Sequence, residues 1–359
     1  MKIFSFIMVF VFCLHAESIS PLPTSNSLSS FEKSTTAFDI STLKISWKAR
    51  INSFLAKGII PLIDVESSFN PSKFDLLDYA KIMDEEGVAM IAFSPQIGDN
   101  AYFKDSKLWN DSPSSLMNAD PSRYVPTSTS GTYPAWTSEP KAFINETIKQ
   151  VTKKNYPLLG EFEFRHYLSP RQYKRNELYR DINIPIDSEV GHMLFTFAEK
   201  SGIPFQIHYE KEDLLIEPLE KMLDAYPKAK VIWCHLAQIR YHDRALQYNP
   251  TLIRNLIKRH PNLYFDLAFG DKDSIYKPSN EFHSTIWDRS SGKLKSEWAQ
   301  LMEDYPYHFL TAFDIGGDRH DELNEKIKVS REILKSLSPQ TQEIVAYKAF
   351  WKLVFNESL

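Results

Sequence analysis

Short apolar runs alternate with amphipathic helix patterns along most of this 359-residue chain. Charged residues followed by glycine or proline separate a helix pattern from the next run, as at Gly202 and Pro227. Apolar runs of this length are typical of strands buried on both faces of a parallel sheet. The eight runs are residues 59–64, 88–93, 124–127, 158–164, 203–208, 230–235, 263–267 and 308–314. Eight strands that alternate with helices predict an α/β fold, the (β/α)8 or TIM barrel.

The helix patterns supply the outer layer of this barrel. Those between the strands cover residues 72–86, 139–154, 187–200, 213–226, 250–260 and 293–304. A further helix is predicted before the first strand, at residues 40–57. Two more are predicted after the last strand, at residues 320–337 and 339–355. We therefore expect one (β/α)8 domain over residues 39–359, with an extra N-terminal helix and C-terminal helices.

The first residues have the pattern of a secretory signal peptide. Lys2 precedes an apolar run that ends at Leu14, and Ala16 provides a cleavage site. The run is shorter than the ~20 residues that a membrane-spanning helix needs. We expect residues 1–16 to be removed and residues 17–38, rich in Ser, Thr and Pro, to form a flexible leader. The mature protein is then exported, to the periplasm or the cell exterior.

Charge and cysteine content narrow the choice of partners. The net charge is −4, and it becomes −5 when residues 1–16 are removed, because they hold one lysine and no acid. An acidic balance argues against nucleic acid, and against an anionic membrane after signal removal. Cys234 is the one cysteine that remains, so no intrachain disulfide forms. We expect a small-molecule substrate as partner, and a homo-oligomer stays possible.

Three of the apolar runs end in a titratable residue. His208, His235 and Asp314 are the last residues of the fifth, sixth and eighth runs. The active sites of (β/α)8 barrels are built at the C-terminal ends of the strands. The three side chains are therefore predicted to meet in one cleft.

The ends of the first and fourth runs also carry carboxyl groups. Glu66 follows the first run, and Glu161 and Glu163 belong to the fourth. Since the residues of a strand alternate between its two faces, Glu161 and Glu163 are predicted to face the barrel interior. Phe162 and Phe164 would then pack outward, against the helices.

In this order the motifs resemble those of the amidohydrolase-related family (amidohydrolase 2 type), which are metal-dependent TIM-barrel hydrolases. That family carries Asp-x-His-x-His on its first strand and often Gly-Glu on its fourth. Its fifth and sixth strands each end in a metal-binding or substrate-binding His, and its eighth ends in an Asp. The matching residues here are Gly160-Glu161, His208, His235 and Asp314. The likeness covers about residues 59–355.

The first strand departs from the family pattern. Glu66 and Ser68 stand where the family has its two metal-binding histidines. The resemblance implies a substituted metal site with the ligands Glu66, His208, His235 and Asp314. Two histidines with two carboxylates suit Zn, Mn or Fe. Two alternatives stay open: the site works without metal, as in some lactonases that look like this family, or catalysis is lost and a binding pocket remains.

The resemblance also implies catalytic roles. Asp314 would orient a metal-activated water and take its proton, as the eighth-strand Asp does in the family. In a site without metal, Asp314 would activate water unaided, and Arg165 or Arg319 would stabilise the oxyanion. Glu161 matches the Gly-Glu of the family and is a further candidate catalytic residue.

Three residues are candidates for substrate binding. Arg319 and His320 follow the last strand, where barrels often bind anionic groups. Ser68 lies at the end of the first strand. Structural interpretations also stay open: Glu66 could pair with Arg165, and the loop that holds Arg319 and His320 could be solvated.

Together these patterns predict a secreted amidohydrolase-like hydrolase. It would use an activated water, with a divalent metal as the first choice, to cleave a C–N or C–O bond of a small amide, lactone or ester. The missing strand-1 histidines leave a catalytically silent binding barrel as one alternative. Paired carboxylates and export leave a secreted glycoside hydrolase as another.

Overall fold

Eight parallel strands surround one axis in the order in which they occur along the chain. The computed structural model describes residues 20–24, 36–97, 107–269 and 272–359. The eight strands are β1 (Leu62–Phe69), β2 (Val88–Pro95), β3 (Tyr124–Pro126), β4 (Glu161–His166), β6 (Phe205–Tyr209), β7 (Val231–Trp233), β8 (Leu263–Asp266) and β11 (Phe309–Leu310). Regular pairing places these eight strands in two sheets, β1-β2-β3 and β11-β8-β7-β6-β4-β5, and a separate two-stranded sheet pairs β9 (Ile275–Tyr276) with β10 (Glu281–Phe282). The short β5 (Ile182–Asn183) pairs antiparallel with β4.

Individual hydrogen bonds join the two sheets at both seams. After β3, the Gly131 N–H donates to the Glu161 carbonyl (2.8 Å), and the Glu163 N–H donates to the Gly131 carbonyl (2.9 Å). At the other seam, the Val65 N–H of β1 donates to the Thr311 carbonyl (3.1 Å) just after β11. The strands therefore follow one another around a barrel, and the (β/α)8 prediction is confirmed.

One buried side chain spans the seam between the first and last strands. The Asp64 Oδ1 atom accepts hydrogen bonds from the backbone N–H groups of Glu66 (3.0 Å) and Phe313 (3.0 Å). Its Oδ2 atom accepts from Ser67 Oγ (2.6 Å), and Ser67 Oγ in turn accepts from the Ile315 N–H (3.1 Å). Asp64 thus fixes the position of the chain on both sides of this seam.

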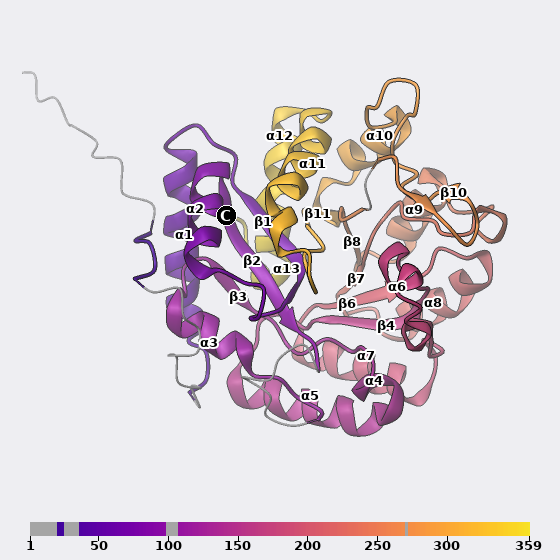
Figure 1. Cartoon of the computed structure of the whole chain (residues 1–359), viewed down its shortest axis with the longest axis horizontal. Helices are drawn as coiled ribbons and strands as arrows, with labels where there is room; N and C mark the ends of the chain where they lie inside the picture. Colours follow the sequence, from indigo (N-terminus) through magenta and orange to yellow (C-terminus); the bar gives the residue numbers. More distant parts are fainter. Residues whose placement is uncertain (1–19, 25–35, 98–106, 270–271) are drawn as a thin grey trace, which may run out of the picture.

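Helices lie around the strands (Figure 1). They are α1 (Ile40–Leu55), α2 (Leu76–Glu86), α3 (Ser112–Ala119), α4 (Ala135–Ser138), α5 (Pro140–Lys154), α6 (Pro170–Lys174), α7 (Glu189–Ser201), α8 (Asp213–Ala225), α9 (Pro250–Arg259), α10 (Ser296–Asp304), α11 (Leu323–Lys335), α12 (Pro339–Glu343) and α13 (Ala349–Phe355). The left-handed residues Gly87 and Gly202 end α2 and α7, as the sequence predicts. The predicted helix 339–355 contains a π-helical turn at Ile344–Lys348.

Strand ends differ most from the sequence prediction. The first strand starts at Leu62 and continues to Phe69, so Glu66 lies inside it. The sixth and eighth predicted runs are longer than the strands, which end at Trp233 and Leu310. The last residues of these two runs, His235 (φ 60°) and Asp314 (φ 50°), have left-handed backbone. Left-handed backbone is incompatible with a strand. Both side chains lie at the rim of the barrel, where they line a cavity.

The predicted alternation along β4 is confirmed. Phe162 and Phe164 are buried on the outer face of β4. Both pack against Trp136, with ring centroids 5.5 and 5.4 Å from that of the indole. Glu161 and Glu163 lie on the opposite, interior face, where both line a cavity. A strand with aromatic residues on one face and carboxyl groups on the other thus separates the packed core from the site.

A buried arginine holds the described part of the predicted leader. Arg123, directly before β3, forms ion pairs with Asp84 (2.6 Å) and Asp120 (2.6 Å). It also donates to the backbone carbonyls of Ser20 (2.8 Å) and Pro21 (3.1 Å). The predicted signal peptide and residues 25–35 lie outside the described residues. Within the described ranges, no helix is long and apolar enough to cross a membrane.

Replacing Arg123 with Met tests how much this buried network stabilises the fold. Removing Arg123 leaves the buried Asp120 unpaired and leaves Asp84 with Arg50 as its remaining ion-pair partner, so we expect the free energy of unfolding to fall by about 3 kcal/mol. Urea denaturation measures this change. The control is Lys107→Met, which breaks the exposed pair with Glu139 and should cost less than about 1 kcal/mol. Equal losses in the two variants would contradict the assigned role of Arg123.

Candidate active site

A polar cavity opens at the C-terminal rim of the strands. Its volume is about 550 Å³. Charged and hydrogen-bonding side chains from the ends of several strands line it. Those predicted from the sequence are Ser68, Glu161, His208, His235, Asp314 and Arg319. The structure therefore brings together six of the nine residues that the sequence singled out for the site.

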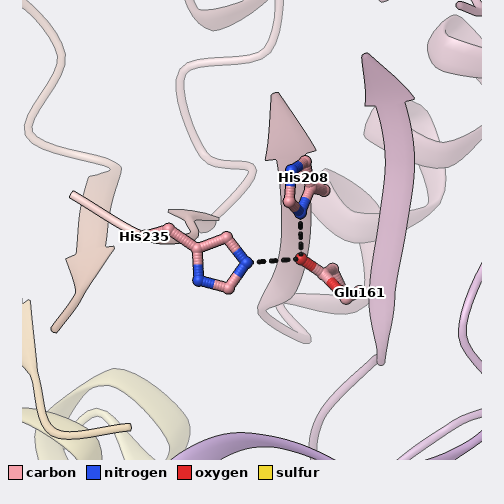
Figure 2. A group of neighbouring side chains, drawn as sticks. All are labelled: Glu161, His208 and His235. Carbon is pink, nitrogen blue, oxygen red and sulfur yellow. Dashed lines mark hydrogen bonds and ion pairs between the residues drawn. The ribbon is translucent and has the colours of Figure 1, made fainter. Parts of the chain in front are cut away.

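Glu161, in the wall of this cavity, lies between two histidines (Figure 2). Its Oε1 atom is 3.0 Å from His208 Nδ1 and 3.3 Å from His235 Nε2. The three side chains come from β4, from β6 and from the segment directly after β7. All three are buried, so their charges interact in a site with little water.

Hydrogen bonding decides the charge of Glu161. Burial alone would raise the pKa of this carboxyl group, but contacts with His208 and His235 hold the pKa well below its ordinary value. Burial would likewise lower the pKa of His235, and the hydrogen bond with Glu161 raises it instead. The wall of the cavity therefore holds an ionised carboxylate shared by two imidazoles.

A second buried group shares His235. Donor atoms of Glu66, His235 and Asp266 lie within 4.8 Å of one another. Among the described residues, Glu66 Oε2, His235 Nδ1 and Asp266 Oδ2 have no hydrogen-bond partner. Burial raises the pKa of Glu66 well above its ordinary value, and the nearby charges of Asp314 and Glu161 add to the effect. Burial raises the pKa of Asp266 as well.

Backbone strain holds His235 between the two groups. Its left-handed φ of 60° is uncommon outside glycine, and such strain is concentrated at functional sites. The His235 N–H donates to Asp266 Oδ1 (2.7 Å), which offsets part of the cost. As a result, one ring nitrogen faces Glu161 and the other lies 4.0 Å from Asp266.

The group of Glu161, His208 and His235 fits a divalent cation. Metal–ligand bonds of about 2.0–2.2 Å place neighbouring donor atoms about 3–3.5 Å apart. The Glu161 oxygen lies 3.0 and 3.3 Å from the two nitrogens. One carboxylate and two histidines form the donor set of many catalytic zinc and non-haem iron sites.

The predicted ligand set does not form one group. Glu66 lies with His235 and Asp266, whereas His208 lies with His235 and Glu161. Asp314 belongs to neither group, because Arg319 binds both of its oxygens, at 2.8 and 3.2 Å. The family resemblance made Glu161 a candidate catalytic residue. In the structure it is the carboxylate nearest to both His208 and His235, which is the position of a metal ligand.

The ion pair also sets the charge of Asp314. Burial would raise its pKa, but Arg319 lowers the pKa to about 2. The carboxylate is therefore ionised at neutral pH and is a weak proton acceptor.

Three predicted site residues do not line the cavity: Glu66, which belongs to the buried group with Asp266, and Arg165 and His320. Arg165 pairs with Asp181 (2.5 Å) and donates to the Ile182 carbonyl (2.9 Å), because a register shift in β4 turns it away from the interior. It contacts neither Glu66 nor the histidines. His320 is buried beside α2, where its Nδ1 atom contacts the Tyr79 hydroxyl (2.7 Å). The predictions of Arg165 as an oxyanion donor and of His320 as a substrate ligand therefore do not match their positions.

Sequence reasoning missed the partners on the other side of His208. Its Nε2 atom is 3.4 Å from Glu210 and 3.2 Å from Arg240, and these two residues form a buried ion pair. Glu210 lies in a run of charged residues after His208, and Arg240 lies in an irregular segment without a periodic pattern. Glu210 and Arg240 are identified by their burial next to His208, and no pattern in the sequence shows that burial.

Glu163 is a further residue with an unusual charge state. Burial raises its pKa to about 7. One carboxyl oxygen pairs with Arg180, and the other, Oε2, is buried without a hydrogen-bond partner. His166, also in the cavity wall, lies 3.9 Å from Glu163 and packs on His208, with ring centroids 4.4 Å apart.

Comparison with known proteins supports the fold. No protein-family model and no curated protein matches the sequence. An uncharacterized TIM-barrel protein from Bordetella bronchiseptica is similar in structure, with a TM-score of 0.51, 12% sequence identity, and coverage of 82% of this chain and 98% of that chain. A 5-carboxyvanillate decarboxylase from Sphingomonas paucimobilis gives a TM-score of 0.49, 14% identity, and coverage of 82% and 99%. At these identities the likeness shows the TIM-barrel fold alone.

The Asp314–Arg319 pair predicts a pH dependence of stability. The pKa of Asp314 is about 2 in the folded chain against an ordinary 3.8. The pair thus stabilises the fold above about pH 4, and this contribution is lost as pH falls toward 2. We expect a loss on the order of 1 kcal/mol, because Asp314 is partly exposed. Urea denaturation of chelator-treated protein should show a smaller acid loss in Asp314→Asn, which keeps the left-handed backbone. Equal losses would contradict the assignment.

Proposed function

We propose that this chain is an exported hydrolase that cuts a C–N or C–O bond of a small molecule with an activated water. A divalent cation held by Glu161, His208 and His235 is part of the proposal. The observation that carries it is a buried, ionised carboxylate in contact with both histidines inside a polar cavity. Three protein donors leave positions open for water and substrate, as in catalytic metal sites. Export rests on the predicted signal peptide.

When bound, such a cation lowers the pKa of a water ligand from about 15.7 to about 7. The residues of the chain supply the remaining requirements. Glu161 contributes the negative donor. Glu210 and Arg240 contact the far nitrogen of His208 and thereby orient its ring toward Glu161.

Asp314 and Glu163 fit two different proton roles. Asp314 is ionised, lines the cavity and accepts a hydrogen bond from the attacking water, which it orients. Glu163 has a pKa of about 7, so it holds a proton in a large fraction of molecules at neutral pH. Because Glu163 lines the cavity, we assign it the donation of that proton to the leaving group.

A binding barrel without catalysis is the second candidate function. It is favoured by Glu66 and Ser68 in place of the two strand-1 histidines. A glycoside hydrolase has less support, because its mechanism needs two carboxyl groups free to flank the scissile bond. Glu161 is instead engaged by His208 and His235.

Metal content tests the first part of the proposal. The purified protein should contain about one equivalent of Zn, Mn or Fe, and His208→Ala and Glu161→Gln should lose it, because each removes one of three donors. Elemental analysis measures the content. Glu66→Gln should retain the metal, and the exposed His192→Ala is the matched histidine control. Wild-type protein without metal, unaffected by chelators in melting temperature and turnover, would contradict the cation site.

Glu163→Gln tests the proton donor. On amide, ester or lactone substrates found by screening, kcat/KM should fall by about 10²–10⁴-fold. In the wild type, kcat/KM should decrease as pH rises through about 7, because Glu163 loses its proton, and this limb should be absent from the variant. Glu177→Gln, at the cavity wall, is the control. An unchanged pH profile in Glu163→Gln would rule out this role.

A further inference from the structure

A buried lysine in the cavity wall has no partner. Lys326 lies on the inner face of α11, is only 9% exposed and lines the cavity. Within the described ranges, its ammonium group makes no hydrogen bond and no ion pair within 4 Å. Lysines are almost never buried without a partner, because an unpaired buried charge is costly.

The other cations of the cavity wall differ from Lys326 in this respect. Each arginine there is paired with a carboxylate. The pairs are Arg171–Glu322, Arg175–Asp318, Arg180–Glu163, Arg240–Glu210 and Arg319–Asp314. Among the lysines and arginines that line the cavity in the described ranges, Lys326 is therefore the one without an ion pair within 4 Å, although its charge also helps to lower the pKa of Asp314.

The surroundings of Lys326 suit a small anionic group. Arg319 and Gly316 also line the cavity, and the charges of Lys326 and Arg319 both act on Asp314. A Cβ atom on Gly316 would lie 2.8 Å from the Cβ atom of Ser68, so glycine allows the loop after β11 to lie directly against β1. Ser68 lines the cavity here and presents its hydroxyl, which accepts a hydrogen bond from Gln96 (3.1 Å).

We propose that Lys326 and Arg319 form a subsite for a carboxylate group of the substrate, so that the substrate is an anionic small molecule. This inference rests on the proposed function and names its substrate class. Two cations and the Asp314 carboxylate leave a net charge of +1, which matches a monoanionic carboxylate. A phosphate dianion would be left with excess negative charge. Lys326 acts as a point charge, and the donors of Arg319 beyond those on Asp314 supply direction.

Calorimetric binding of benzoate, benzamide and inorganic phosphate to the purified full chain tests this subsite. Benzoate and benzamide have nearly the same shape and differ in charge. Wild type should bind benzoate at least about tenfold more tightly than benzamide or phosphate, and Lys326→Met should lose about tenfold or more for benzoate. Lys326→Arg should retain most of the affinity. Lys328→Met, on the exposed side of α11, should behave as wild type.

Three binding results would overturn the proposal. They are no detectable benzoate binding to wild type, equal affinity for benzoate and benzamide, and unchanged benzoate affinity in Lys326→Met. Tighter binding of phosphate than of benzoate would overturn the assignment to a monoanion. Binding of these probes needs neither turnover nor a cation, so loss of the proposed hydrolase activity would leave this result separate.

Thermal unfolding separates a ligand-binding lysine from a structural one. Without ligand, Lys326→Met should melt at a temperature no lower than wild type, because the variant removes an unpaired buried charge. Saturating benzoate should raise the melting temperature of wild type more than that of Lys326→Met. A marked loss of stability in unliganded Lys326→Met, not restored by Lys326→Arg, would assign Lys326 to packing and refute the subsite.

Discussion

The carboxyl group of Asp64 joins the first strand of the barrel to the last. Its hydrogen bonds with Glu66, Ser67 and Phe313 fix the register between β1 and the segment that follows β11. This is the seam at which the barrel closes. The site depends on this closure, because Asp314 follows one residue after Phe313. A barrel open at this seam would separate Asp314 from the residues of β1.

The sequence predicted the barrel well because its signal is repeated eight times and each apolar run is bounded by a charged helix end. His208, His235 and Glu161 were also found, since the ends of parallel strands meet at one rim. The sequence did not reveal that the four predicted ligands fall into separate groups, because the left-handed backbone at Asp314 and its pairing with Arg319 depend on contacts across the fold. Lys326 was missed for the same kind of reason: only the packing of α11 shows which lysine of a helix is buried.

Polar groups without a hydrogen-bond partner lie in the cavity wall and in the buried group next to it. Among the residues that the structure describes, one carboxyl oxygen each of Glu66 and Asp266 is buried without a hydrogen-bond partner, and the Lys326 ammonium in the cavity wall has no ion pair within 4 Å. Each such group costs folding free energy that a packed apolar side chain would not. Several unpartnered polar groups at one place lower the stability of the fold, and such a loss is common at functional sites. In this chain these groups lie at one end of the barrel.

The left-handed backbone at His235 and Asp314 also limits how this site changes during evolution. Most side chains are strained in that conformation, and asparagine is among the few that tolerate it. Asparagine codons differ by a single nucleotide from those of histidine and of aspartate. One mutation at either position can therefore abolish the chemistry while the strand ends keep their shape, so an inactive descendant that still folds and still binds lies one step away from this chain.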